Sequence, residues 1–544
     1  YGLAEGGSDW QEWKVLKVDS GENLTDHIKW VKFSSAEWAP DSSGFYYSRY
    51  PEPDEENQLA GANYGQMLYF HRVGEPQEKD ALIYERPDHA DWLLSGQVTD
   101  DGRYLIITVR AGSSSENAVF YQDRKNPEAQ VVELLNQFDA RYALVGSDGD
   151  RLWFKTDFEA PRSQVIEIDL GNPARDKWKT LVPEANEALE SVSVINNQFV
   201  CSYLRDVASQ IRVLSLEGEL VHELELPGLG RVEGLQGERD DSETFYSFSS
   251  FARPSTVYRH NLKAHESTVF RAPKLEFDPD DFETKQVFYS SKDGTQVPMF
   301  LTHRRGMQLN GQNATILYGY GGFNIARKPS FSVTNLVWME KGGIYASANI
   351  RGGSEYGEEW HQGGMKLNKQ NVFDDFIAAA EWLIEENYTS APYLAIEGGS
   401  NGGLLVGAVL NQRPDLFGAA VPHVGVMDML RFDQFTIGWA WVSDYGSPEN
   451  PEEFKALAAY SPYHNIRPDF EYPATLVTTA DHDDRVVPAH SFKYAAALQN
   501  AQAGPDPILI RIGTRAGHGA GKPTSKRIDE AADKLAFLFD VLGE

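Results

Sequence analysis

The sequence of 544 residues contains a single cysteine, Cys201. One thiol cannot form an internal disulfide, so a disulfide-stabilised scaffold is excluded, and Cys201 is expected to be a structural or free thiol. Histidines and cysteines show no zinc-site spacing, so we predict no metal and no other cofactor. Long apolar runs are also missing, because no segment reaches the length of a membrane-spanning helix.

Positive charge is scarce in this chain. Lys and Arg number 50 against 80 Asp and Glu, which gives a formal net charge of −30. Nucleic acids and anionic membranes are bound by clustered Lys and Arg, so neither is expected as a partner. The acidic surface favours solubility and could attract cationic peptides.

Glycine is abundant, and residues 398–402 place Ser400 in a Gly-x-Ser-x-Gly pattern. The apolar run before it, 393–396, has the length of a strand, and 404–410 reads as a buried helix. A sharp strand-to-helix turn would expose the serine hydroxyl and aim the next backbone N–H at a developing oxyanion. The pattern alone is weak, and it predicts a nucleophile only if an acid and a histidine follow in that order.

Both partners follow, each behind a further strand pattern. Residues 472–480 lead into a loop with three aspartates, and residues 507–512 lead into a glycine-flanked loop with His518. Catalytic groups gather at the carboxyl ends of strands in open α/β sheets. The order of serine, acid and histidine is that of an α/β-hydrolase. Spacings of 83 and 35 residues leave room for a helix in each crossover.

Asp483 is the preferred acid, because Val486 supplies the apolar residue commonly found three positions after the acid in such hydrolases. The other two aspartates, Asp481 and Asp484, are then expected to face solvent or form local caps. Order and loop context favour His518, and five other histidines are expected to be surface or satisfied core residues: His361, His423, His464, His482 and His490. We therefore predict that Ser400 attacks, His518 moves the proton and Asp483 orients the imidazole.

An earlier strand pattern, 314–318, ends in the Gly-rich loop 319–324. A loop at this place in the fold contributes the second oxyanion donor. The Tyr320 phenol in this loop is an unusual but chemically sound donor. The glycines would otherwise serve turn geometry alone.

Five motifs together resemble the prolyl oligopeptidase family, serine peptidases that join a β-propeller to an α/β-hydrolase domain. The motifs are 318–324, 349–353, 398–403, 481–488 and 516–523. The resemblance implies that the Tyr320 hydroxyl and the Asn401 backbone N–H form the oxyanion hole. It also implies that Arg485 binds a substrate carbonyl one residue before the scissile proline.

The resemblance further implies a proline pocket, in which Trp441 stacks on the substrate ring. The residues at the lining positions are Phe323, Val426, Ile437, Trp441, Tyr445 and Val486. A proline ring is small and apolar and lacks an N–H, so a slot walled by an indole and aliphatic groups selects it by shape. The aromatic segment 435–441 would otherwise read as ordinary core.

The N-terminal half has a different pattern, in which acidic turns precede alternating aromatic strands. Gly44, Gly102, Gly149 and Asn197 mark successive turns, separated by 58, 47 and 48 residues. This period approaches that of four-stranded propeller blades, and a β-sandwich array is the alternative. We predict a propeller over 1–276 and an α/β-hydrolase domain over 277–544, with the acidic stretch 277–281 at the change.

The expected function is cleavage of short peptides after proline through an acyl-enzyme, with the propeller limiting access by size. Two alternatives stay open: a related oligopeptidase with acylaminoacyl or basic specificity, and a catalytically inert propeller scaffold. Relative to the family, whose full-length members are expected to have seven blades, the chain starting at Tyr1 is expected to lack an N-terminal portion. A monomer is expected, and a cytoplasmic location, with a periplasmic or secreted one left open.

Overall fold

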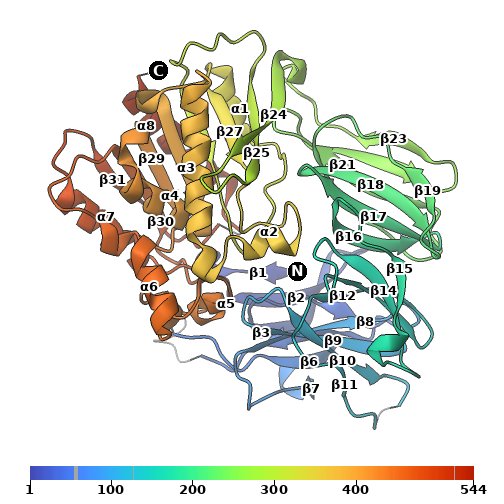
Figure 1. Ribbon diagram of the computed structural model, residues 1–544. Coiled ribbons are helices and arrows are strands. Elements are labelled where there is room, and N and C mark those ends of the chain that lie inside the picture. The colour runs from blue at the N-terminus through green and yellow to red at the C-terminus, as the bar shows by residue number, and fades with distance from the viewer. Residues whose placement is uncertain (54–58, 60, 127, 520, 544) are drawn as a thin grey trace.

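The computed structural model describes residues 1–53, 59, 61–126, 128–519 and 521–543. Ala520, within the histidine-containing motif, lies outside these residues. Two parts follow each other along the chain (Figure 1). Small antiparallel sheets make up the N-terminal part, and one mixed sheet with helices on both faces makes up the C-terminal part.

Six sheets of consecutively paired strands form the N-terminal part. The first sheet has three strands, β1 (Gly2–Leu3), β2 (Gln11–Lys17) and β3 (Glu22–Val31). The second contains β4 (Glu37–Trp38), β5 (Gly44–Arg49), β6 (Met67–Arg72) and β7 (Ala81–Tyr84). The third contains β8 (Trp92–Val98), β9 (Tyr104–Ala111), β10 (Asn117–Asp123) and β11 (Val132–Leu135).

The next three sheets also have four strands each. They are β12 (Tyr142–Asp148), β13 (Arg151–Thr156), β14 (Gln164–Asp169) and β15 (Lys179–Val182); β16 (Ala188–Ile195), β17 (Gln198–Arg205), β18 (Ala208–Ser215) and β19 (Leu220–Glu223); β20 (Arg231–Gln236), β21 (Glu243–Ser249), β22 (Thr256–Asn261) and β23 (Glu266–Arg271). Figure 1 shows the six sheets one after another along an arc, from β1–β3 to β20–β23. The described residues thus form one sheet fewer than the seven blades expected of full-length family members.

The acidic turns of the sequence repeat each join the first and second strands of a sheet. They lie between β4 and β5, β8 and β9, β12 and β13, β16 and β17, and β20 and β21. Second strands such as β9 and β17 are buried along most of their length, because neighbouring sheets pack on both of their faces. Aromatic and β-branched residues suit such positions. The predicted blade repeat is therefore confirmed.

The C-terminal part is built on an eight-stranded sheet of order β24-β25-β27-β26-β28-β29-β30-β31. Its strands are β24 (Phe282–Ser290), β25 (Gln296–Arg304), β26 (Thr315–Tyr318), β27 (Ile344–Ala348), β28 (Leu394–Gly399), β29 (Ala419–His423), β30 (Ala474–Ala480) and β31 (Ile508–Gly513). The six strands from β27 to β31 run parallel, and β24 and β25 are antiparallel. The change predicted at 276/277 falls in the connection between β23 and β24.

Helices cover both faces of this sheet. The helices are α1 (Val333–Glu340), α2 (Glu358–Gln362), α3 (Gln370–Glu385), α4 (Asn401–Gln412), α5 (Val442–Tyr445), α6 (Pro451–Tyr460), α7 (Ala489–Ala501) and α8 (Thr524–Leu542). Apolar residues of α3, α4 and α7 pack in one core with one face of the sheet, and those of α1 and α8 pack in a second core. Catalytic groups are expected at the carboxyl ends of the parallel strands of such a sheet.

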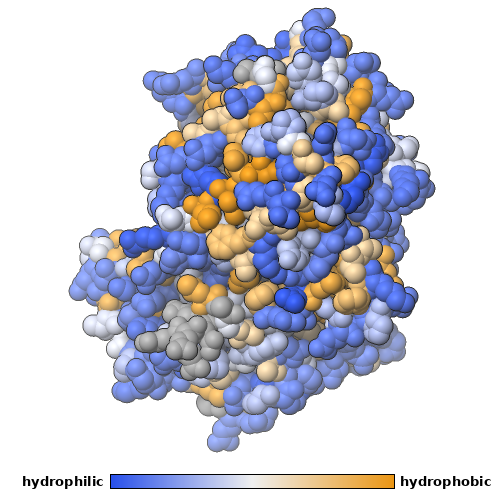
Figure 2. Space-filling view, turned by 90° about the vertical axis from the view of Figure 1, so that its left-hand side faces the viewer, coloured by the Kyte–Doolittle hydropathy of each residue, from blue (hydrophilic) through white to orange (hydrophobic). Residues whose placement is uncertain are grey.

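The surface agrees with the acidic composition. Figure 2 shows hydrophilic residues over most of one side, with apolar groups among them. On the C-terminal part, exposed apolar side chains include Leu509 and Ile512 of the edge strand β31 and Ile528 of α8. None of the helices in the described residues is long and apolar enough to cross a membrane.

Candidate active site

Ser400 lies at the turn between β28 and α4, with a backbone φ of 59° and ψ of −117°. Residues other than glycine rarely adopt this backbone conformation, and such strain is concentrated at functional sites. The flanking glycines are required by close approach. A Cβ on Gly398 would lie 2.3 Å from the Gly402 carbonyl oxygen, and one on Gly402 would lie 2.6 Å from that of Gly319. The predicted sharp turn is confirmed.

Asp483 and His518 meet at the carboxyl ends of β30 and β31. The His518 Nδ1 lies 2.7 Å from Asp483 Oδ2. The Asp483 carboxylate is buried, and its Oδ1 accepts backbone N–H bonds from Arg485 and Val486 at 3.1 and 2.9 Å. These bonds hold the carboxylate toward the imidazole, which suits it to fix the ring's orientation. Among the described residues no hydrogen bond joins Ser400 Oγ to His518.

The two neighbouring aspartates behave differently from each other. Asp481 Oδ1 lies 2.6 Å from His482 Nδ1 and accepts the Ala516 N–H, from the loop of His518, at 3.3 Å. Asp484 is buried and accepts from Ser8 Oγ at 3.0 Å, the Asp9 N–H at 2.8 Å and Lys32 Nζ at 2.8 Å. The expectation that Asp484 faces solvent or a local cap is therefore wrong, because it joins the first sheet of the N-terminal part to the loop of Asp483.

The Gly-rich loop after β26 brings Tyr320 beside the Ser400 turn. A Cβ on Gly322 would lie 2.7 Å from the Asn401 side chain, and Asn401 Nδ2 donates to the Tyr320 carbonyl oxygen at 2.5 Å. Burial raises the pKa of the Tyr320 phenol well above its ordinary value, so the hydroxyl stays protonated and can donate. Within the described residues neither this hydroxyl nor the Asn401 backbone N–H has a hydrogen-bond partner.

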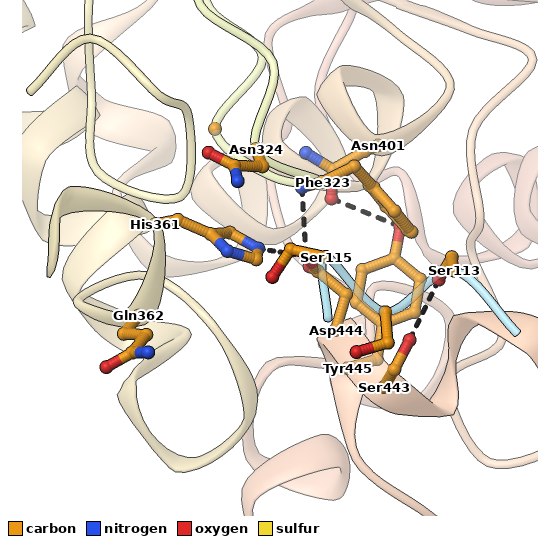
Figure 3. Close-up of polar contacts among 12 residues, drawn as sticks. Ser113, Ser115, Phe323, Asn324, His361, Gln362, Asn401, Ser443, Asp444 and Tyr445 are labelled. Atoms are coloured by element: carbon orange, nitrogen blue, oxygen red, sulfur yellow. Dashed lines mark hydrogen bonds and ion pairs between the residues drawn. The ribbon is translucent and has the colours of Figure 1, made fainter. Parts of the chain in front are cut away.

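A buried polar network supports this loop, and the sequence reasoning missed it. Lys369 Nζ donates to the Gly321 carbonyl oxygen at 2.9 Å and to Asn401 Oδ1 at 3.1 Å. The Tyr445 hydroxyl also donates to Asn401 Oδ1, at 3.1 Å. Asp444 accepts the Phe323 N–H at 2.9 Å (Figure 3). Its carboxylate lies 3.7 Å from Lys369 Nζ. The network thereby fixes both the Gly-rich loop 319–324 and Asn401, the residue after Ser400.

His361 is the outer member of this network. Its Nε2 lies 2.9 Å from Asp444 Oδ2 and its Nδ1 lies 3.0 Å from Glu358 Oε1. Burial by itself lowers the pKa of His361, but the two carboxylates outweigh it and raise this pKa to about 9. Burial likewise raises the pKa of Asp444, yet Lys369 and His361 hold it below its usual value. His361 is thus a satisfied buried histidine, as expected from the sequence.

Five of the six predicted proline-pocket residues lie in one apolar cluster. Val426, Tyr445 and Val486 are buried in it, and Phe323 and Trp441 are partly buried against it. The Phe323 and Tyr445 rings meet edge-on with centroids 5.2 Å apart, and Trp441 lies 6.5 Å from Tyr445. Ile437 is buried nearby in sequence but outside this cluster.

Two loops of the N-terminal part hold the segment that carries Trp441. The Ser113 hydroxyl donates to the Ala440 carbonyl oxygen at 2.7 Å (its contact with Ser443 is seen in Figure 3). The Tyr64 ring stacks on Trp439 with centroids 4.9 Å apart. The aromatic wall of the cluster therefore depends on the propeller for its position.

Arg485 is anchored from the N-terminal part as well. Its guanidinium forms a two-pronged ion pair with Asp9, with contacts of 2.8 and 2.7 Å. Burial lowers the pKa of Arg485, but Asp9 outweighs it and the net shift is upward. The group is about two-fifths exposed, at 38%, so a substrate carbonyl could still reach it.

Taken together, a propeller-like part faces an α/β-hydrolase sheet that carries a serine turn and an acid–histidine pair, which defines a two-domain serine hydrolase. The family model described as "Prolyl oligopeptidase, N-terminal beta-propeller domain" matches residues 1–273, and that of the "Prolyl oligopeptidase family" matches 329–544. The chain belongs to the prolyl oligopeptidase family.

Individual prolyl endopeptidases and prolyl oligopeptidases are also similar to this chain over its full length or nearly so. A prolyl endopeptidase of Elizabethkingia meningoseptica is 43% identical over 100% of this chain and 77% of its own length. Prolyl oligopeptidase ophP of Omphalotus olearius is 40% identical over 100% and 76%. A structure from a study of two prolyl endopeptidases has a TM-score of 0.95 at 41% identity, covering 100% of this chain and 80% of the other. Prolyl oligopeptidase B of Galerina marginata, bound to a 25mer macrocyclization substrate, has a TM-score of 0.93 at 37% identity, covering 99% and 77%.

Proposed function

We propose that this protein is a serine endopeptidase that hydrolyses short proline-containing peptides on the carboxyl side of proline. The observation that carries the proposal is the union of the strained Ser400 turn with the buried Asp483 carboxylate 2.7 Å from His518. Family membership and the prolyl endopeptidase relatives support it.

The proposed chemistry divides among three side chains. His518 takes the Ser400 proton as the hydroxyl attacks the carbonyl carbon of the proline residue, and it then gives that proton to the leaving amine. Asp483 holds the ring and stabilises the imidazolium. Water, activated by His518, next hydrolyses the acyl-enzyme and restores Ser400.

The remaining roles concern charge and specificity. The Tyr320 hydroxyl and the Asn401 N–H, which have no other partner in the described residues, would bind the oxyanion. The aromatic cluster would take the proline ring, with Trp441 stacked on it. No acidic side chain is among the six residues expected to line this pocket, which disfavours the alternative of basic specificity. Arg485, oriented by Asp9, would bind the preceding carbonyl.

Digestion of one peptide with a single internal proline tests this function. Mass spectrometry should show one cut, after that proline, with wild-type protein and none with Ser400→Ala. Cleavage elsewhere would contradict the proposed specificity, and undiminished cleavage by Ser400→Ala would contradict the assignment of Ser400 as the nucleophile. The monomeric state, the cytoplasmic location and the lack of nucleic-acid partners stay predictions.

A further inference from the structure

A cavity of about 450 Å³ lies between the propeller and the hydrolase, and none of the proposed catalytic or proline-pocket residues lines it. One wall comes from the fourth, fifth and sixth sheets, through β13, β16 and β20. The other wall comes from residues 324–330, which continue the oxyanion loop, and from the start of α2. The cavity therefore begins where the Phe323 side of the proline cluster ends.

The lining of this cavity is cationic, against the charge of the chain as a whole. Three acidic residues line it, Asp157, Glu190 and Glu358, whereas six basic residues do: Arg141, Lys155, Arg162, Arg231, Arg327 and Lys328. The full chain has 30 more acidic than basic residues. A local excess of one sign between protein walls focuses the field toward ligands of the opposite sign.

Most of these cations are not neutralised by protein carboxylates. In the described part of the chain, Arg141, Arg162 and Arg327 form no ion pair. Buried Lys155 donates to two backbone carbonyl oxygens, those of Leu189 and Glu190, at 3.0 and 2.7 Å. Arg231 pairs with Glu233 through its terminal nitrogen, and only its Nε is buried without a hydrogen-bond partner in the described residues.

Each of the three acidic residues already has a partner. Glu190 pairs with Lys328, and Asp157 accepts the backbone N–H of Arg141 at 2.7 Å. Glu358 accepts from Asn324 Nδ2 at 3.0 Å and contacts His361. The guanidinium groups of Arg141 and Arg162 therefore have no carboxylate partner in the described residues. The positive charge of Arg141 also acts outside the cavity: burial, and then this charge, lower the pKa of Arg110.

We propose that this cationic cavity binds a carboxylate of the peptide substrate, either the C-terminal carboxylate or an acidic side chain. The proposal rests on the proposed peptidase function. Guanidinium groups bind carboxylates through paired, charge-assisted hydrogen bonds. A peptide whose proline sits in the aromatic cluster would pass Asn324, which directly follows Phe323 and lines the cavity. The site would favour acidic peptides although the outer surface repels them.

Matched internally quenched peptides test the proposal. The set has one proline and differs only in a C-terminal carboxylate or carboxamide, or in Glu or Gln placed before or after the proline. For wild-type protein we expect kcat/KM to be about tenfold higher for one carboxylate member than for its neutral partner. In the double variant Arg141→Gln, Arg162→Gln that ratio should approach one, chiefly through KM. The pair that shows the preference identifies which carboxylate is bound.

Controls separate this proposal from the peptidase assignment. Arg271→Gln, on the exposed strand β23, should keep the preference, and a short uncharged chromogenic proline substrate should be turned over equally by the double variant. Titration of the same peptides against Ser400→Ala, by fluorescence anisotropy, gives their affinities without turnover. Equal affinities for carboxylate and neutral partners, or a preference that survives in the double variant, would overturn the site. Absence of turnover with a preserved affinity difference would instead overturn the peptidase function alone.

Discussion

Replacement of Tyr320 by Phe isolates one hydroxyl of the proposed oxyanion hole. The ring would keep its packing, and the hydroxyl has no hydrogen-bond partner among the described residues, so no group is left unpaired. We therefore expect the free energy of unfolding to change by no more than about 0.5 kcal/mol. A large loss of activity in this variant must therefore come from the chemical step and not from unfolding.

The size of that effect follows from where the charge develops. Burial raises the pKa of Tyr320, so the phenol remains a donor throughout the working pH range. A single oxyanion donor contributes about 3–4 kcal/mol to the transition state, which corresponds to a roughly 10²- to 10³-fold loss in kcat. KM should change little, because the ground-state carbonyl does not need this donor.

Steady-state kinetics with a chromogenic proline peptide, beside a thermal melt of each protein, provide the measurement. The matched control is Tyr318→Phe, which removes a hydroxyl from the same strand end outside the proposed oxyanion hole. A decrease in kcat below about threefold for Tyr320→Phe, or an effect confined to KM, would refute the assignment of Tyr320.

Three further predictions concern Trp441 of the proline pocket, Arg485, and His361 of the buried polar network. Trp441→Ala should cost about 1–3 kcal/mol in kcat/KM for proline substrates, and an unchanged Pro-to-Ala rate ratio would exclude stacking as the source of specificity. Arg485→Lys loses the planar fork, so KM should rise about tenfold with kcat retained, and an unchanged KM would argue against carbonyl binding. The pKa of His361 is raised to about 9 by Asp444 and Glu358, from about 6.5 in the unfolded chain. The stabilisation from its charge is thus fully present below pH ~6.5 and is lost as the pH rises through about 9. His361→Gln should therefore lower the free energy of unfolding in urea by about 3 kcal/mol near pH 6 and by little near pH 10. An equal loss at both pH values would contradict this.

Much of the fold follows from local patterns in the sequence. The acidic turns and the alternating strands repeat within tens of residues, and the Ser400 turn is fixed by glycines adjacent to it. The order of Ser400, Asp483 and His518 then places them on three strand ends of one sheet. Such features depend on short-range geometry and topology, which a single sequence displays.

The contacts that the sequence did not reveal connect distant segments. Ser8 meets Asp484 across 476 residues, and Lys32 meets it across 452. His361 and Asp444 are 83 residues apart, although together they support the loop of Tyr320. Nothing in the residues around Asp484 distinguishes a buried interdomain carboxylate from a solvated one. The sequence likewise does not predict that Lys369 is buried, because an isolated lysine is ordinarily a surface residue.

We propose that Ser400 cleaves after proline because the Trp441 cluster binds the proline ring. The most direct measurement compares kcat/KM for four chromogenic peptides that differ only in the residue before the leaving group: Pro, Ala, Arg or Phe. We predict that kcat/KM for the Pro peptide exceeds that for each of the others by at least about tenfold, the scale of a shaped apolar pocket, and that Ser400→Ala hydrolyses none. Faster hydrolysis of the Arg or Phe peptide than of the Pro peptide would contradict it.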